Sequence, residues 1–382
     1  MAEPKVRFKR DDGSEFPAWK TIPISDVFAE VSEKNHPDMP VLSVQQGVGT
    51  VLRDSSDRNI LYDKSNLRNY KVIKRDDFII HLRSFEGGLE CSNHDGISSP
   101  AYRILRPQAI LSAAYRDYFR SYNFIHNKLA VSVVGIRDGK NIDMDTFWQI
   151  SMSVPCLEEQ RKIANFLSCI DEVISACKEE VLNLMTQKKV VMKKIFSQDV
   201  RFKRTDWSDF PEWQEAKLGE IASAKVGSKP DRILEEKTDF EYINAGTTNS
   251  GYVNAYNRKG DVTTTPSRGQ GGIGVVGYQE KAFWLGPLCY GIQSRVESIL
   301  NKYLYFYIDN NSECIMSCVK TGSIPAVNQE DLIQIVIRFP CIEEQRFIVD
   351  FLSDFDEVIA AAKKELELWK ELKKGLLQQI FV

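Results

Sequence analysis

The stretch Pro155-Cys156-Leu157-Glu158-Glu159-Gln160-Arg161 occurs a second time, with one conservative change, as Pro340-Cys341-Ile342-Glu343-Glu344-Gln345-Arg346. Each copy opens a longer segment, residues 155–196 and 340–381, and half of the aligned positions in these segments are identical at one constant offset. The chain therefore contains an internal duplication. A fixed repeat of this kind is the first feature from which a fold should be predicted.

Both segments carry apolar residues spaced alternately three and four apart, the pattern of a coiled coil whose narrow stripe faces a partner helix. A proline precedes each segment, and the acidic pair that follows suits the positive end of a helix dipole. A helix of about 37 residues would be roughly 55 Å long. We predict that the two helices pair and act as a spacer; the alternative is an ordinary amphipathic helix in a globular core. The predicted seam consists of Ile163, Leu167, Ile170, Ile174, Val181 and Leu184 in the first copy, and of Ile348, Leu352, Phe355, Ile359, Leu366 and Trp369 in the second.

A lysine interrupts the apolar seam at the same place in each copy, at Lys188 and Lys373. A polar residue in a seam can fix the register of two helices at a cost in stability. A lysine can equally lay its aliphatic stem along the seam and extend its ammonium group into water. The sequence leaves both interpretations open.

The duplication includes a short lead before each variable region. Arg7-Phe8-Lys9-Arg10 with Phe16-Pro17-Ala18-Trp19 has its twin in Arg201-Phe202-Lys203-Arg204 with Phe210-Pro211-Glu212-Trp213. The repeated unit is thus a lead, a long insert and a helix, and the two inserts are not detectably alike. By this symmetry we expect the two ends of the chain to lie close together. A twofold axis perpendicular to the helices would make them antiparallel, but the sequence alone does not fix their direction.

Composition places the chain among folded soluble proteins: it has 382 residues, of which 43% are hydrophobic and 27% charged, enough for two or more domains. No apolar run approaches the ~20 residues of a membrane span, and no signal peptide is visible. The eight cysteines form no CxxC pair, so we expect reduced thiols in a cytoplasmic protein. The four histidines have no metal-site spacing, and we expect no metal. A net charge of −3 excludes a uniformly basic nucleic-acid binder but not binding through local patches.

Local patterns within the inserts predict mixed α and β structure. Residues 41–44 and 77–82 read as strands, whereas residues 112–130 and 299–308 read as helices. Asp143 and Asn328 occupy equivalent positions in the two repeats, and each is expected to cap a short helix.

Several segments resemble catalytic motifs, but the neighbouring sequence lacks the strands, helices or spacing that those motifs require. Gly269–Gly274 matches GxGxxG, but no apolar strand precedes it and no helix pattern follows it. Asp231 with Glu235 and Glu236 superficially resembles a metal-dependent nuclease signature, yet the spacing is short and fits a solvated charge run on a helical turn. No Ser/His/Asp arrangement has a credible local context. The sequence therefore favours binding over catalysis.

Several loops combine glycine with residues whose side chains suit DNA base edges. Arginine can donate two hydrogen bonds to guanine, and glutamine or asparagine can pair with adenine in the major groove. Taken singly, each loop is an ordinary surface loop, and the architecture around it gives it weight. The candidate DNA-binding residues are Gln45, Gln46, Arg53, Arg83, Ser84, Glu86, Arg137, Lys140, Ser228, Lys229, Arg232, Asn244, Thr247, Thr248, Asn249, Arg268, Gln270, Arg295, Thr321 and Ser323.

Taken together, the motifs resemble those of the specificity (S) subunit of a type I restriction–modification system. The resemblance covers essentially the whole chain and rests on the two Glu-Glu-Gln-Arg helices, the Phe-Pro-x-Trp leads and Thr321-Gly322-Ser323-Ile324-Pro325-x-x-Asn328. It implies an α+β protein with two target-recognition domains, residues 1–154 and 200–339, and an antiparallel pair of long helices, residues 155–199 and 340–382. One departure is that Gly135–Lys140 in the first insert lacks the Thr-Gly-x-Ile pattern of the second.

The resemblance also implies a division of labour. Each domain would read one half of a bipartite site in double-stranded DNA, and the helices would set the spacer. Two modification subunits would dock on the helices and methylate DNA with S-adenosylmethionine, while restriction subunits would add ATP- and Mg-dependent translocation and cleavage. This chain would be non-catalytic and would hold no cofactor.

The rival hypothesis is a coiled-coil scaffold or assembly protein whose inserts bind protein or sugar without DNA specificity. Selection of duplexes from a random-sequence pool separates the two hypotheses, because only a sequence-specific reader enriches particular bases.

Overall fold

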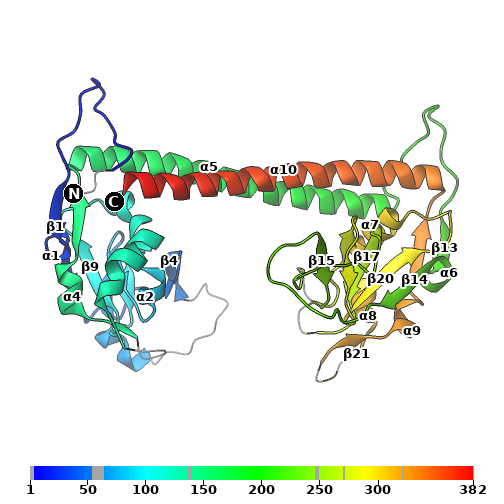
Figure 1. Ribbon diagram of the computed structural model, residues 1–382, viewed down its shortest axis with the longest axis horizontal. Coiled ribbons are helices and arrows are strands. Elements are labelled where there is room, and N and C mark those ends of the chain that lie inside the picture. The colour runs from blue at the N-terminus through cyan, green and yellow to red at the C-terminus, as the bar shows by residue number, and fades with distance from the viewer. Residues whose placement is uncertain are drawn as a thin grey trace. The chain divides into compact units, whose positions relative to one another are not determined.

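The computed structural model describes residues 4–53, 64–135, 140–245, 249–269, 272–320, 322 and 324–381. The chain divides into two compact units, Met1–Lys178 with Lys364–Val382, and Glu179–Lys363. Each unit holds one mixed α/β domain and a part of each of two long helices (Figure 1). The predicted fold class, a duplicated α+β protein with two long helices, is confirmed. The predicted four-part division of the chain stays a prediction.

In the first unit an antiparallel sheet has the strand order β2-β9-β6-β7. Its strands are β2 (Phe28–Val31), β9 (Arg103–Pro107), β6 (Phe78–Ile80) and β7 (Glu90–Cys91). Four smaller pairings surround it: β1 (Lys20–Pro23) with β12 (Ser151–Val154), β3 (Leu42–Gln45) with β4 (Gly49–Leu52), β5 (Lys71–Ile73) with β8 (Gly96–Ser98), and β10 (Val133–Val134) with β11 (Asn141–Ile142). The helical pieces are α1 (Ile24–Val27), η2 (Lys64–Asn69), α2 (Ser84–Gly87), α3 (Ser112–Tyr115), η3 (Tyr118–Arg120), η4 (Phe124–Lys128), η5 (Leu129–Ser132) and α4 (Met144–Gln149).

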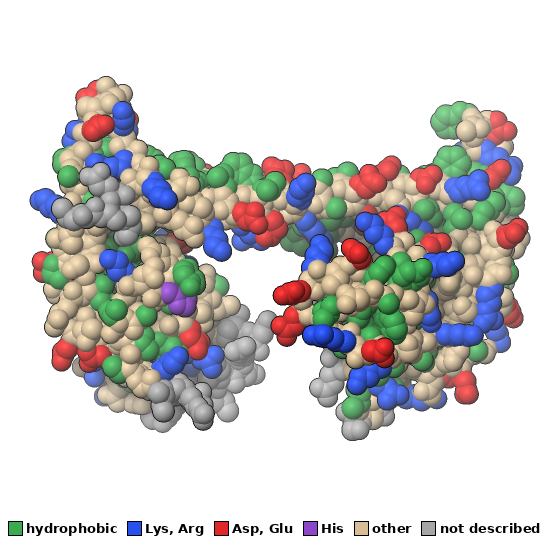
Figure 2. Space-filling model, viewed as in Figure 1, with side chains coloured by type: hydrophobic (Ala, Val, Ile, Leu, Met, Phe, Trp, Pro, Cys, Tyr) green, Lys and Arg blue, Asp and Glu red, His purple; other side chains and the backbone are tan. Residues whose placement is uncertain are grey.

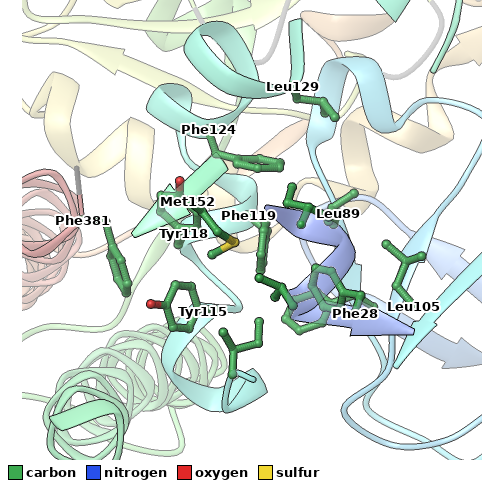
Figure 3. Packing of buried hydrophobic residues seen from close by; sticks show 14 of the residues in the cluster. Phe28, Leu89, Leu105, Tyr115, Tyr118, Phe119, Phe124, Leu129, Met152 and Phe381 are labelled. Atoms are coloured by element: carbon green, nitrogen blue, oxygen red, sulfur yellow. The ribbon is translucent and has the colours of Figure 1, made fainter. Parts of the chain in front are cut away.

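Residues 112–130 are largely helical, as predicted, but they do not form one continuous helix. The segment consists of short α, 3-10 and π turns, and an extended Ser121 ends η3. Figure 3 shows the physical reason, since Tyr118, Phe119 and Phe124 all lie in one core, with Phe381 at its edge. The Tyr118 ring lies 4.9 Å from that of Phe381, and the Phe119 ring lies 4.9 Å from that of Phe124. We infer that aromatic packing overrides helix propensity here.

The second unit repeats the strand order of the first. Its antiparallel sheet runs β14-β20-β17-β18, with β14 (Ala222–Val226), β20 (Cys289–Ser294), β17 (Val262–Pro266) and β18 (Gly277–Gln279). The other strands are β13 (Gln214–Lys217) paired with β23 (Val336–Phe339), β16 (Tyr252–Val253) and β19 (Trp284–Leu285) on either side of β15 (Phe240–Ile243), and β21 (Val319–Lys320) paired with β22 (Ala326–Val327). The short helices are α6 (Leu218–Ile221), α7 (Asn301–Asn310), α8 (Glu313–Ser317) and α9 (Gln329–Leu332). Two inserts without detectable sequence similarity thus share one sheet topology, and α7 confirms the helix predicted near residues 299–308.

The two predicted caps differ. The Asp143 carboxylate accepts a hydrogen bond of 3.0 Å from the backbone amide of Thr146 and begins α4, as predicted. Asn328 precedes α9 with an extended backbone, but its side chain makes no capping hydrogen bond. The expected side-chain cap at Asn328 is therefore wrong, and only its backbone oxygen takes part, accepting the amide of Leu332 at 3.0 Å.

The long helices are α5 (Leu157–Phe196) and α10 (Ile342–Ile380). In the first unit Ile163 near the start of α5 shares a core with Ile380 at the end of α10, and in the second unit Ile195 near the end of α5 shares a core with Ile348. The helices are therefore antiparallel. The backbone amide of Lys5 donates to Gln379 O at 2.9 Å, so the predicted meeting of the two chain ends is confirmed (Figure 1).

Most residues of the predicted seam are buried, either between the two long helices or in the core of a domain. Ile163, Leu167, Ile170, Ile174, Ile348, Leu352, Ile359 and Leu366 are buried, whereas Val181, Leu184, Phe355 and Trp369 are half-buried. In the first unit Ile170, Ile174 and Leu366 form a cluster against which Trp369 packs. Among the described residues, no helix has the length and hydropathy of a membrane-spanning segment.

The lysines in the seam are paired with acids of the opposite helix. In the first unit Lys373 Nζ lies 2.6 Å from Asp171 Oδ1 and 2.5 Å from Asp117 Oδ2. In the second unit Lys188 Nζ lies 2.5 Å from Asp356 Oδ1. The two interhelical pairs are equivalents in the duplication, and both lysines are mostly buried. The arrangement therefore favours a register-fixing role over the snorkelling alternative.

Candidate nucleic-acid interface

In each unit an arginine of the duplicated lead forms an ion pair with a buried glutamate near the start of the long helix. In the first unit Arg7 Nη2 lies 2.8 Å from Glu159 Oε2, and Trp19 Nε1 donates to the same oxygen at 3.1 Å. In the second unit Arg201 Nη2 lies 2.9 Å from Glu344 Oε2. Each arginine also approaches the other carboxylate oxygen at 3.2 Å, so both pairs are bidentate. The repeated Arg-Phe-Lys-Arg and Glu-Glu motifs therefore form one clamp.

The glutamine of each Glu-Glu-Gln-Arg motif joins the helix to the insert through backbone groups. Gln160 accepts the amide of Leu111 at 2.8 Å and donates to Ala109 O at 3.1 Å. In the second unit Gln345 accepts the amide of Leu300 at 2.9 Å and donates to Ser298 O at 2.8 Å. Both glutamines are buried. Each recognition domain is thus fixed to its helix at a repeated, fully bonded joint.

The Gln45 and Gln46 candidates of the first unit lie exposed on the turn that joins β3 and β4. A Cβ atom placed on Gly87 would lie 2.6 Å from the Gln46 amide nitrogen, so the Gln46 side chain passes directly over that glycine. The structure therefore brings the Gln45–Gly49 turn together with the Arg83–Gly88 segment. Lys140 joins them, because its Nζ lies 5.8 Å from the centre of the Phe85 ring.

The remaining first-unit candidates are placed differently. Arg83, Glu86 and Lys140 are exposed, and Arg53 is half-buried. Ser84 is fully buried, and its hydroxyl accepts the amide of His81 at 2.8 Å. Ser84 is the first residue of α2, and its buried side chain does not reach the surface.

Candidates of the second unit gather at the ends of three strands. Ser228 and Lys229 follow β14, Asn244 follows β15, and Arg268 follows β17. All three places border the segment Leu285–Leu288: the Ser228 amide donates to Leu285 O at 3.0 Å, Asn244 Oδ1 accepts the amide of Leu288 at 3.0 Å, and Ser267, next to Arg268, donates to Leu288 O at 2.9 Å. Ser228, Lys229 and Arg268 are exposed, whereas Asn244 is half-buried. The structure therefore assembles a polar edge from residues far apart in the sequence.

Three further candidates of this unit lie outside that edge. Arg232 is exposed between β14 and β15, and Asn249 is half-buried between β15 and β16. Arg295 is exposed just after β20, where its amide bonds to Ile221 O, so it lies at the opposite end of the sheet from Arg268. The candidates Arg137, Thr247, Thr248, Gln270, Thr321 and Ser323 lie outside the described residues.

Among the described residues, the polar edge carries no strong concentration of charge of one sign. Tyr290 beneath Arg268 donates its hydroxyl to Val327 O at 3.1 Å, and burial raises its pKa although the nearby guanidinium of Arg268 opposes that shift. Figure 2 shows acidic and basic side chains interspersed over the visible face, without one uniform basic patch. The acids at 231–236 are exposed and not helical, which corrects the expected helical turn. Within the described part of the chain, no group of three His, Cys, Asp or Glu side chains could hold a metal ion.

Sequence reasoning missed the residues that hold the candidate side chains in place. Asn257 bonds both backbone groups of Leu285, at 2.7 and 3.0 Å, and Trp284 Nε1 donates to Ser228 O at 2.8 Å. In the first unit Glu90 and Arg120 contact the backbone of Gly47. One signal was available, because an acid between Leu89 and Cys91 in a strand indicates a buried charge that requires a partner.

Comparison with known proteins finds similarity to type I restriction enzyme specificity subunits. Residues 211–368 match the type I restriction modification DNA specificity domain. A putative type I restriction enzyme specificity subunit, MjaX, of Methanocaldococcus jannaschii is 26% identical over 62% of this chain and 60% of its own length; the chain thus spans less than two thirds of that relative. The type I restriction enzyme MjaVIII specificity subunit of the same organism is 23% identical over 97% of this chain and 94% of its own length.

Solved structures share the fold along the whole chain. The type I restriction–modification S subunit from M. genitalium superposes with a TM-score of 0.59 at 18% identity, over 100% of this chain and 99% of that chain. A second structure, described in work on complex assembly and conformational transition of the type I system, gives a TM-score of 0.55 at 18% identity, over 95% of this chain and 97% of that chain. The chain thus matches a type I restriction modification DNA specificity domain over residues 211–368 and is similar over nearly its whole length to a type I restriction enzyme specificity subunit.

Proposed function

We propose that this chain is the DNA-reading subunit of a type I restriction–modification complex and that each unit reads one half of a bipartite duplex site. The observation that carries the proposal is the repetition of one sheet order in two otherwise dissimilar inserts, each presenting exposed polar side chains beside glycine-bearing turns. Gln45 and Gln46 of the first unit suit adenine edges, and Arg268 of the second suits guanine.

The proposal assigns the chemistry to partners. The chain supplies no catalytic group and no cofactor; two modification subunits use S-adenosylmethionine, and restriction subunits use ATP and Mg. The docking surface proposed for the modification subunits lies on α5 and α10, because both helices carry exposed apolar side chains, including Leu182, Val358 and Leu368. The complex is expected to work on DNA in the cytoplasm.

The test is selection of duplexes by the full-length chain from a random-sequence pool at physiological salt, followed by sequencing. Two short conserved blocks separated by unspecified bases are the expected result. If no DNA sequence is enriched and the chain binds proteins or sugars instead, the result would favour the scaffold hypothesis.

Two arginine variants show which end of the second sheet faces DNA. Arg268→Ala should weaken binding of the selected duplex and relax one base position, because a bidentate contact contributes about 1–3 kcal/mol of discrimination. Arg295→Ala is the matched control, an exposed arginine at the other end of β20. A larger loss for Arg295→Ala than for Arg268→Ala would reverse the assignment of the DNA-facing edge.

A further inference from the structure

A buried ion pair lies beneath the Gln45–Gly49 turn of the first unit. Glu90, in β7, is fully buried, and its Oε2 lies 2.5 Å from Nη2 of Arg120, whose side chain is 16% exposed. Removing two charges from water is costly, and a pair of apolar residues of similar volume is often at least as stable. Stability alone therefore gives weak grounds for placing charges here.

Both charges bond to the backbone of one turn residue. The Gly47 amide donates to Glu90 Oε1 at 2.7 Å, and Arg120 Nη1 donates to Gly47 O at 3.3 Å. Asn93 Nδ2 donates to Val48 O at 2.8 Å, and the Val48 amide closes the turn on Gln45 O at 3.1 Å. These backbone groups are thus bonded within the protein, while Gln45 and Gln46 are exposed and the side chain of Gln46 passes over Gly87.

The ion pair is itself fixed by a close backbone approach. The amide of Leu89, next to Glu90, donates to Phe119 O at 3.2 Å. Gly88 has a φ of +78°, and a Cβ atom there would lie 1.9 Å from Phe119 O, so only glycine lets these segments approach so closely. Because Phe119 precedes Arg120, this contact sets the guanidinium opposite the Glu90 carboxylate.

We propose that Glu90 and Arg120 are positioning residues for base reading: they hold the Gln45–Gly49 turn so that Gln45 and Gln46 meet the bases of the first unit's half-site. This inference rests on the proposed DNA-reading function. Bidentate contacts of an amide to adenine require accurate placement, and a turn anchored at both polar groups of Gly47 supplies it. Neither Glu90 nor Arg120 needs to touch DNA for this role.

The decisive variant replaces the ion pair with an apolar pair, Glu90→Leu with Arg120→Met. If the ion pair only stabilised the fold, this double variant would keep both stability and sequence preference. We expect thermal stability well above that of Glu90→Leu alone, but a loss of about tenfold or more in base discrimination at one half-site. The half-site read by the second unit should keep its preference, which makes it an internal control.

A second buried ion pair in the same unit provides a matched control. Arg106 bonds Asp77 through Nε and Nη2, each at 2.9 Å, and its side chain makes no hydrogen bond or ion pair with the described Gln45–Gly49 turn. Asp77→Leu with Arg106→Met should therefore leave both half-site preferences unchanged. Loss of discrimination in this control as well would overturn the inference, because any disturbance of the unit would then suffice.

Arg120→Lys provides a second test in case the double variant with the apolar pair does not fold. Lysine keeps a positive charge for Glu90 but lacks the planar fork that reaches Gly47 O as well. A drop in discrimination at the same half-site supports the inference, and unchanged discrimination overturns it. The two levels of the argument remain separable: a wild-type chain that enriches no sequence contradicts the proposed function, whereas a bipartite preference that survives in the variants contradicts only the positioning role.

Discussion

At the scale of single residues, Lys373 governs the charge state of a buried acid. Burial of Asp117 raises the pKa of its carboxyl group, but the attraction and hydrogen bond of Lys373, together with the charges of Arg116 and Arg120, outweigh burial, so the net pKa is lowered. Asp117 therefore stabilises the folded protein at pH values above its unfolded pKa, and this contribution is lost as the pH falls through the folded pKa. The lysine thus makes a carboxylate tolerable at the helix–domain junction.

Replacing Lys373 with Met should destabilise the first unit by roughly 3 kcal/mol at pH 7, because two acids lose their shared partner. With the lysine gone, burial should raise the pKa of Asp117 against the smaller effects of Arg116 and Arg120, so the deficit should shrink as acidification towards about pH 4 neutralises the carboxylate. Denaturant unfolding of both proteins at several pH values measures this. As a control, Lys370→Met removes only an exposed i,i+3 pair with Glu367 and should cost under about 0.5 kcal/mol. A loss of stability in Lys373→Met that does not change with pH would contradict the role assigned to Lys373.

Two equivalent tryptophans differ by one hydrogen bond. Trp19 Nε1 donates to Glu159, whereas Trp213 Nε1 is buried without a hydrogen-bond partner among the described residues. Trp19→Phe should therefore cost about 1.5 kcal/mol or more beyond the cost of Trp213→Phe, since both changes remove similar ring area and only the first removes a bond to a carboxylate. Hydrogen exchange resolved by unit measures the difference. Equal losses would show that the indole bond to Glu159 adds nothing.

At the scale of secondary-structure elements, the two short helices α4 and α9 begin at equivalent residues with unequal caps. Asp143→Ala should lower amide protection in α4, because the carboxylate of Asp143, whose pKa is lowered by its bonds to Thr146, accepts the helix amide. Asn328→Ala should leave α9 protection unchanged, since its side chain makes no capping bond. Loss of protection at Asn328→Ala comparable to that at Asp143→Ala would show that the backbone position, not the side chain, makes the cap.

The sequence predicts an element well where one periodicity controls its burial. The alternation of three and four from Ile163 to Leu184 predicted α5, because a long helix has few ways to bury a narrow stripe. The same reasoning indicated helical structure at residues 112–130 but not its breaks, because Tyr118, Phe119 and Phe124 are buried by several short turns in a core that also contains Phe381, from the other end of the chain. Non-local packing of this kind has no local signature.

The candidate interface was predictable to a similar extent. Turn composition indicated Gln45, Gln46 and Arg268, whose exposure follows from their places after strands. Ser84 shares that composition but is buried, and Glu90 with Arg120 went unrecognised because the pair joins segments that only the folded chain brings together. The shared sheet order was also invisible, since it depends on backbone pairing that many sequences satisfy.

Changing the length of both helices should change the spacer of the recognised site. Removing one heptad from each helix shortens each by about 10 Å, which corresponds to about three base pairs at ~3.4 Å per step. The spacer in sequences selected by the shortened protein is expected to contract by about that amount. Removing the same residues from α5 alone is the control and should abolish selection by breaking the Lys373 and Lys188 register; an unchanged spacer after the double deletion would rule out a ruler.

At the scale of the whole molecule, the two inserts should be exchangeable one at a time. Replacing residues 20–154 with another insert of the same topology should change one block of the selected duplex and preserve the other, because each domain has its own core. Sequencing of duplexes selected by the wild-type and exchanged proteins provides the measurement. Changes in both blocks would contradict independent reading by the two domains.

The joint made by Gln160 and Gln345 bears on how such proteins diversify. Each glutamine bonds its insert only through backbone groups, at Ala109 and Leu111 or at Ser298 and Leu300. A backbone group is the same whatever side chain it carries, so mutation can alter an insert extensively without weakening its attachment. Recombination between related genes can likewise exchange entire inserts and yield a correctly joined protein at once. If the inserts read DNA as proposed, inheritance of a constant joint would permit rapid change in the recognised bases.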